Sequence, residues 1–255
     1  SPVTGFVTDM ILTKPSSTGS WNIGARKTGI YYLRTDNNGA SLNTSSLVWD
    51  RMDGVWDTTR SGQVVWGWKR APGYFDVCCY SGTGSARTVS HNLGVVPEMI
   101  WIKRREQTRD WGTGFGSLGW TKRGPALDQG EIAYTTSTWW NDTAPTSSVF
   151  TVGSSATTNG SGGHFVAYLF ATVAGVSKVG SYTGNSTDGH QIDCGFSNGA
   201  RFVLLKNTTV SNTNWLVFDT VRGIATGNDS RLYLNTTDGE NTGTDYVDPH
   251  SSGFI

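Results

Sequence analysis

The chain has 255 residues, a formal net charge of zero, 33 glycines and 11 tryptophans. Zero net charge excludes the basic surface typical of nucleic-acid-binding proteins, and no apolar run reaches the roughly 20 residues of a membrane-spanning helix. An aromatic content of 12% excludes disorder. Abundant Gly, Ser, Thr and Asn indicate short β-strands joined by tight turns, so we expect an all-β fold with no nucleic-acid binding and no membrane insertion.

The first predicted strand covers residues 10–14, an apolar run that ends in Lys14. Trp21 follows in the next predicted strand, and Gly29 lies eight residues after it. Further along, Trp49 and Trp56 belong to a stretch that is dense in aromatic residues. The absence of a long run of helix formers favours strands throughout this part.

The middle of the chain contains seven short apolar segments bounded by turn residues, which predict seven strands. They cover residues 74–80, 86–91, 99–103, 111–115, 132–136, 149–152 and 164–170. Apolar residues occupy successive positions of the last segment, so we expect it to be buried on both faces. The Asn159-Gly160 pair before it predicts a hairpin between the last two strands.

The last part of the chain resumes the pattern of the first. An apolar strand is predicted at residues 202–206 and ends in Lys206, Trp215 follows, and Gly223 lies eight residues further on. In the middle part, Lys103, Trp111 and Gly119 stand in the same order, and Gly119 again lies eight residues after the tryptophan.

The recurring Lys, Trp and Gly predict one unit used about two and a half times. The predicted boundaries are a partial copy at residues 1–71 without its first strands, a complete copy at 72–172, and a partial copy at 173–255 without its last strands. We call these the first, second and third copies. Because a half-unit leaves strand edges unpaired, we expect the chain to continue at both ends; the alternatives are that the partial copies complete each other or a neighbouring subunit.

Seven strands in about 100 residues predict a β-sandwich or jelly roll in each copy. A propeller is the rival, but its blades usually have about 40 to 50 residues. We expect each copy to have its own core around Trp21, Trp111 or Trp215. The repeated lysines are predicted to extend their ammonium groups to solvent. The repeated glycines, Gly29, Gly119 and Gly223, are expected where the backbone needs a positive φ.

Residues with chemistry are sparse in this sequence. The three cysteines, Cys78, Cys79 and Cys194, lack the spacing of a zinc site, and no histidine has an evident partner. The run Asp36-Asn37-Asn38-Gly39 begins like a calcium loop but lacks the rest of one. We therefore expect no catalytic residue, no metal, no cofactor and no enzymatic activity.

Tryptophans in polar surroundings are the candidate contact residues. Trp139 and Trp140 are adjacent in a polar segment. Neighbours in a strand point to opposite faces, so at least one of them is expected at the surface. Together with Trp49 and Trp56, they are predicted to contact a subunit or a glycan.

Four sequence strings resemble a domain of tailed-phage virion proteins that recurs in tail fibres of marine and cyanobacterial phages. The strings are YSGTG at 80–84, VSHNLG at 89–94, FVAYLFA at 165–171 and SKVGSYTG at 177–184. The resemblance implies a virion structural protein, in a tail fibre or other tail appendage, that is extracellular after release. We further expect a homo-oligomer that assembles with other virion proteins and contacts host-surface glycans. A carbohydrate-binding adhesin module is the alternative, and a glycan-degrading tailspike ranks third.

Overall fold

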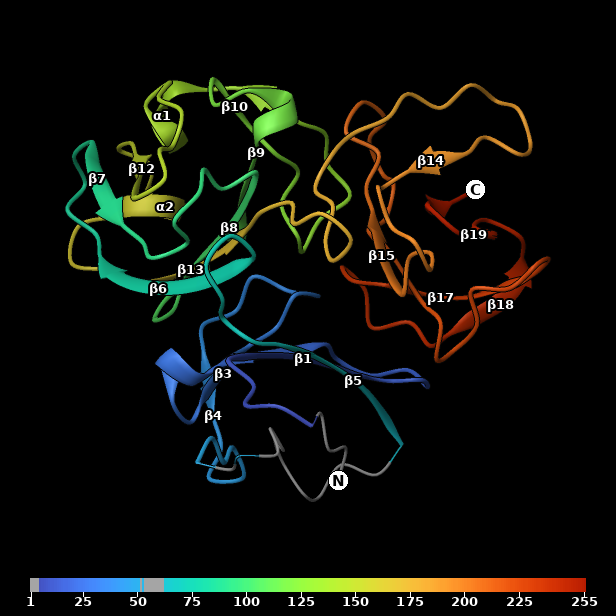
Figure 1. Cartoon of the computed structure of the whole chain (residues 1–255). Coiled ribbons are helices and arrows are strands. Elements are labelled where there is room, and N and C mark those ends of the chain that lie inside the picture. Colours follow the sequence, from blue (N-terminus) through green and yellow to red (C-terminus); the bar gives the residue numbers. More distant parts are fainter. Residues whose placement is uncertain (1–4, 51, 53–61) are drawn as a thin grey trace.

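The computed structural model describes residues 5–50, 52 and 62–255, and its regular structure is almost entirely antiparallel β-sheet. Figure 1 shows three groups of strands, from the three copies, around a common centre. The all-β prediction is therefore confirmed.

The first copy forms one five-stranded sheet. Its order is β4 (Leu42–Asn43), β3 (Tyr31–Leu33), β2 (Asn22–Ala25), β1 (Met10–Pro15) and β5 (Gln63–Trp68). The apolar run of β1 lies between β2 and β5 and is buried along most of its length. A short 3-10 helix, η1 (Arg26–Thr28), connects β2 to β3.

The second copy contributes a four-stranded sheet in the order β6 (Phe75–Ser81), β13 (His164–Phe170), β8 (Met99–Arg104) and β9 (Gly112–Phe115). Strand β13 is buried on both faces, as its continuous apolar sequence predicts. Val166, Tyr168 and Phe170 enter one hydrophobic cluster, whereas Phe165 and Leu169 enter another.

An outer layer of the second copy covers this sheet. It consists of η2 (Gly116–Leu118), the pair β10 (Lys122–Arg123) and β11 (Tyr134–Thr135), α1 (Ser137–Trp140), the pair β7 (Arg87–Ser90) and β12 (Val149–Val152), and α2 (Ala156–Asn159). The predicted hairpin at Asn159-Gly160 is wrong, since β12 pairs with β7 and not with β13. Asn159 ends α2, and its buried amide donates to the carbonyl oxygens of Ser85 and Gly153, both at 2.7 Å.

The third copy has a four-stranded sheet and a smaller three-stranded one. The first has the order β15 (Phe202–Leu205), β16 (Leu216–Asp219), β17 (Asp229–Tyr233) and β18 (Asn241–Thr244). The second has the order β14 (Ile192–Asp193), β20 (Gly253–Phe254) and β19 (Pro249–His250).

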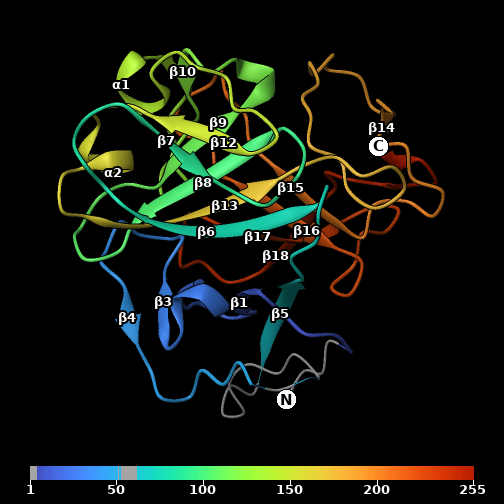
Figure 2. The same ribbon diagram turned by 60° about the vertical axis from the view of Figure 1, so that its left-hand side comes forward.

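Among the described residues, four sheets have three or more strands, and their arrangement resembles that of propeller blades (Figures 1 and 2). Three of these sheets carry the repeat. Tandem jelly rolls were therefore the wrong architecture. The period of about 100 residues had argued against a propeller because it is about twice the usual blade length. In the second copy it covers a blade of four strands together with the outer layer that packs on that blade.

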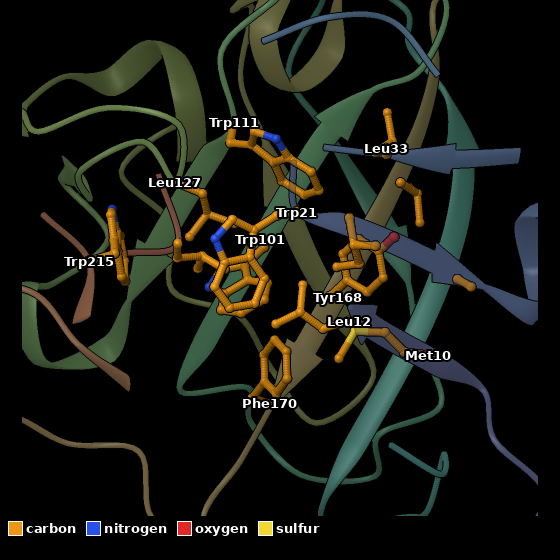
Figure 3. Packing of buried hydrophobic residues seen from close by; sticks show 14 of the residues in the cluster. Met10, Leu12, Trp21, Leu33, Trp101, Trp111, Leu127, Tyr168, Phe170 and Trp215 are labelled. Carbon is orange, nitrogen blue, oxygen red and sulfur yellow. The ribbon is translucent and has the colours of Figure 1, made fainter. Parts of the chain in front are cut away.

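One hydrophobic cluster is shared by all three copies, which corrects the expectation of separate cores. It holds the repeated tryptophans Trp21, Trp111 and Trp215, none of which is more than 2% exposed. Figure 3 shows their side chains near Trp101 and Leu127. Smaller clusters lie away from this centre in each copy, so the copies have outer cores as well as a common one.

The three repeated glycines adopt the positive φ that their spacing predicts. Gly29 has φ 62°, Gly119 has φ 76° and Gly223 has φ 121°. Each follows the strand that begins beside the core tryptophan, at a place where an added Cβ would meet no atom within 4 Å. These glycines are therefore required by backbone geometry and not by crowding.

Candidate functional site

The repeated lysines are buried, which corrects the expectation that their ammonium groups extend to solvent. Lys14 and Lys103 have no exposed surface, and Lys206 is partly buried. Each Nζ donates to backbone carbonyls at the end of its strand or in the loop that follows; Lys14 Nζ, for example, lies 3.1 Å from the oxygen of Ser17, and Lys103 Nζ lies 2.8 Å from that of Arg104. Burial lowers the pKa of both Lys103 and Lys206 to about 8. These lysines hold a loop and are not presented to a ligand.

A second repeated polar position fixes the backbone of each core tryptophan. The amide nitrogens of Trp21, Trp111 and Trp215 donate to a side-chain oxygen at 3.2, 3.0 and 2.9 Å. The acceptors are Asp36, Asp128 and Asn235 in chain order. Asp36 belongs to the run that begins like a calcium loop, and its oxygen serves this structural bond.

The indole nitrogens join each copy to the one before it. Trp111 Nε1 donates to the oxygen of Arg34 in the first copy at 2.8 Å. Trp215 Nε1 donates to Ala126 in the second copy at 2.9 Å, and Trp21 Nε1 to Tyr233 in the third copy at 2.7 Å. The third bond links the last copy to the first, so the three copies form a closed ring.

A backbone bond recurs at the same three boundaries, which we call seams. Its acceptor lies two residues after each buried lysine, and its donor lies seven residues after the carbonyl that accepts the indole bond. The bonds are Ser41 N to Arg105 O at 2.6 Å, Ala133 N to Thr208 O at 3.2 Å, and Glu240 N to Ser16 O at 2.7 Å. The polar groups at the repeat positions are thus used in hydrogen bonds within the chain and are not free to bind a ligand.

Two of the predicted contact tryptophans are buried. Trp139 is 6% exposed and Trp140 is fully buried, both in the outer core of the second copy. They lie on the single helical turn α1, capped by the Thr136 side chain, and not on a strand. The alternation argument therefore did not apply, and neither residue is available for a surface contact.

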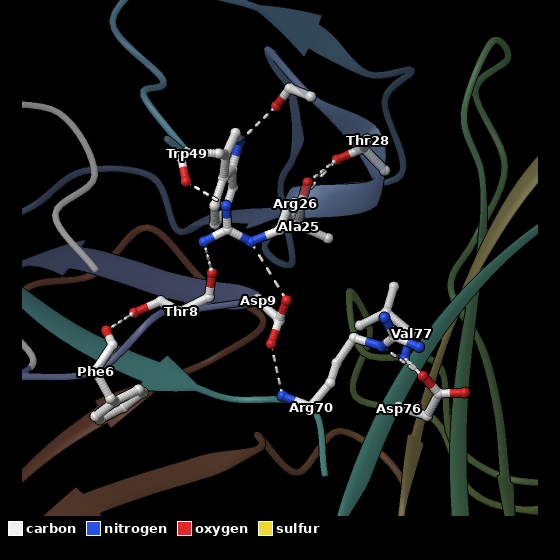
Figure 4. A network of polar contacts seen from close by, with 11 residues as sticks. Phe6, Thr8, Asp9, Ala25, Arg26, Thr28, Trp49, Arg70, Asp76 and Val77 are labelled. Atoms are coloured by element: carbon white, nitrogen blue, oxygen red, sulfur yellow. Dashed lines mark hydrogen bonds and ion pairs between the residues drawn. The ribbon is translucent and has the colours of Figure 1, made fainter. Parts of the chain in front are cut away.

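Trp49 is partly buried, and Trp56 lies outside the described residues. The Trp49 indole donates to the oxygen of Gly29 at 2.7 Å, and the Arg26 guanidinium lies 5.6 Å from its ring centre (Figure 4). Arg26 also pairs with Asp9 at 3.3 Å. Trp49 is thus a fixed part of the first copy's polar network.

Three exposed tyrosines were not among the sequence candidates. Each copy has one, between 41% and 49% exposed, with a guanidinium over its ring. The pairs, with the distance from the guanidinium carbon to the ring centre, are Tyr31 with Arg105 at 5.3 Å, Tyr134 with Arg123 at 3.8 Å and Tyr246 with Arg231 at 4.2 Å. We call them the tyrosine stacks.

The stacks differ in charge. Arg123 pairs with Glu131, is 5% exposed, and also lies 4.8 Å from the Trp139 ring centre. Neither Arg105 nor Arg231 has a carboxylate partner within 4 Å in the part of the chain that the structure describes. Arg123 lies directly opposite Tyr134 on the neighbouring strand, and this cross-strand pairing forms the stack. The stack could not be predicted because the sequence does not show the register of these two strands.

Within residues 5–50, 52 and 62–255, no group of three or more His, Cys, Asp or Glu side chains is placed to hold a metal ion. Nor does any helix there have the length and apolar character to cross a membrane. The three cysteines are free thiols.

Comparison with known proteins gives one result. Residues 25–255 match the model of a domain of unknown function, DUF7483. No curated protein and no solved structure matches the chain.

Proposed function

The chain belongs to the DUF7483 family, and we propose that it is a structural module of a phage virion that contacts host-surface glycans through its tyrosine stacks. In this proposal it is part of a tail fibre or another tail appendage. It acts as a homo-oligomer together with other virion proteins, and it works by binding, without catalysis or a cofactor.

The observation that carries the glycan contact is the presence of one tyrosine stack in each copy. A guanidinium lies over each tyrosine ring, so the ring is held in place while 41% to 49% of the residue stays exposed. Tyrosine gives a large, rigid contact at a low cost in conformational entropy, and its apolar ring can pack against the face of a sugar. Three such sites on one rigid ring allow multivalent attachment to a repeating glycan.

The virion location is supported by the sequence strings that resemble tailed-phage proteins. The closed ring agrees with a scaffold role, since the repeated tryptophans join each copy to the next and the repeated Asp or Asn positions fix the backbone of those tryptophans. The alternative, a carbohydrate-binding adhesin module outside a virion, uses the same tyrosines and differs only in location.

A glycan array probed with the full chain tests the contact. Replacing Tyr31, Tyr134 and Tyr246 together by Ala is expected to weaken binding, by roughly two- to tenfold for each site. Tyr182→Ala is the matched control, because Tyr182 is 49% exposed but packs against His190 and Phe254, and no guanidinium of the described residues lies over its ring. Equal binding by the triple variant and the parent would contradict the proposal. Mass spectrometry of purified phage particles tests the location separately.

A further inference from the structure

We propose that Tyr31, Arg105 and Lys27 form a subsite for a sugar ring that carries a carboxylate, such as a uronic acid. This rests on the proposed function, because it assumes that the tyrosine stacks contact glycans. The proposal adds that the Tyr31 stack prefers an acidic sugar, whereas the Tyr134 stack does not.

The backbone on both sides of this subsite is fixed. Arg105 accepts the seam bond from Ser41 N at 2.6 Å, and its own amide donates to the oxygen of His164 at 2.8 Å. Tyr31 lies in β3, between β2 and β4, and follows η1 closely. The Arg105 guanidinium lies 5.3 Å from the Tyr31 ring centre, on a backbone that hydrogen bonds hold in place.

The charge of Arg105 is uncompensated. Its side chain makes no hydrogen bond and no ion pair with the described residues. Its Nε is buried without a partner among the described residues, and the residue as a whole is partly exposed. An exposed planar guanidinium fits a carboxylate through two parallel hydrogen bonds.

A second cation lies nearby. Lys27 is exposed on η1, and its backbone oxygen is 3.9 Å from the Cys79 thiol. Burial raises the pKa of the Cys79 thiol, while the positive charges of both Arg105 and Lys27 act to lower it. Lys27 therefore lies beside β6 and only four residues before Tyr31 in the chain, and its charge and that of Arg105 act on the same thiol.

The Tyr134 stack provides the contrast within the same chain. There the Glu131 carboxylate already neutralises Arg123, which is 5% exposed, so its guanidinium is not available to a ligand. That stack offers only a ring face, which suits a neutral sugar. The Tyr31 stack offers a ring face together with an unpaired cation, which suits an acidic one.

Calorimetric titration of the full chain at low salt, with tetragalacturonate and with neutral maltotetraose, tests the subsite. Tetragalacturonate is expected to bind more tightly than maltotetraose, and more weakly as salt is added. Arg105→Gln is expected to weaken tetragalacturonate binding by roughly tenfold or more, because a charge-assisted hydrogen bond is lost. Lys27→Gln should have a smaller effect of the same sign.

Lys122→Gln is the matched control, because it removes an exposed cation next to the Tyr134 stack and should leave tetragalacturonate binding unchanged. Circular dichroism of each variant checks that it is folded. Equal affinity for the two oligosaccharides, or undiminished tetragalacturonate binding by Arg105→Gln, would overturn the subsite. Glucose 6-phosphate is a third probe, and binding of it in preference to tetragalacturonate would assign the site to phosphate instead. If the tyrosine triple variant still weakened neutral glycan binding, the proposed function would survive that loss.

Discussion

The second and third copies hold the same core tryptophan with different chemistry. In the second copy Asp128 accepts the amide of Trp111 at 3.0 Å, and in the third copy Asn235 accepts that of Trp215 at 2.9 Å. Nearly equal distances show that the position needs a hydrogen-bond acceptor and not a charge. The carboxylate is the costly choice, since burial raises the pKa of Asp128 from its ordinary 3.8 to about 6.

The buried lysines of these copies differ in the same way. Lys103 is fully buried near Asp128 and Asp110, which both oppose the lowering of its pKa by burial. Lys206 is partly buried and has Glu131, from the second copy, in that role. The second copy thus has a partly buried acid near a fully buried lysine, while the third has an amide in place of the acid and a partly buried lysine. The hydrogen-bond geometry that the two copies share and the charge in which they differ can be changed by separate substitutions.

The largest expected effect concerns what the copies share. Trp111→Ala and Trp215→Ala each remove a buried indole from the common core together with a seam bond. Each is expected to lower the free energy of unfolding by about 3 to 5 kcal/mol, as large-to-small changes of buried aromatics do. Urea denaturation followed by tryptophan fluorescence measures both. If one change cost under about 1 kcal/mol and the other its full value, the seams would not be equivalent.

The next effect concerns the charge of Asp128, which the third copy replaces by the neutral Asn235. The pKa of Asp128 is higher in the folded than in the unfolded chain, so the folded state binds more protons between about pH 4 and pH 6. This group therefore adds stability as the pH falls through that window, by about 2 to 3 kcal/mol for a shift of roughly two units. Asp128→Asn is expected to remove that rise, as measured by urea denaturation across the pH range.

The reverse exchange is the control. Asn235→Asp places a carboxylate beside Asn214, whose Oδ1 now accepts from the Asn235 amide at 2.9 Å. The new acid should favour its protonated form and give the third copy a pH dependence of the same sign. Asp36, whose pKa is also raised by burial, contributes equally to parent and variants and cancels in the difference. A pH profile unchanged by both exchanges would show that the charge difference has no energetic consequence.

The spacing of Lys, Trp and Gly predicted which residues recur, because each recurring type has one physical role at one distance along the chain. It did not predict the seams, since these bonds join residues as far apart as Trp21 and Tyr233 and depend on ring closure. Trp139 and Trp140 were misplaced because a single capped helical turn has no periodicity to detect. Tyr134 was missed as a contact residue because its exposure depends on register with Arg123, and a two-residue strand carries too little pattern to fix register.

The smallest expected effect concerns the repeated glycines, whose positive φ the copies share. Gly119 has φ 76° and Gly223 has φ 121°, and a Cβ added to either would meet no atom within 4 Å. Alanine at each position should therefore cost only backbone strain, about 1 to 2 kcal/mol.

Gly184→Ala separates that strain from the general effect of adding a methyl group. Gly184 is exposed, has no atom within 4 Å of an added Cβ, and does not have a positive φ. Its replacement should leave the melting temperature unchanged or raise it slightly, because alanine restricts the unfolded chain. If Gly119→Ala and Gly223→Ala were as harmless as Gly184→Ala, the turn after the core tryptophan would tolerate another backbone conformation. The repeated glycine would then not be a geometric requirement shared by the copies.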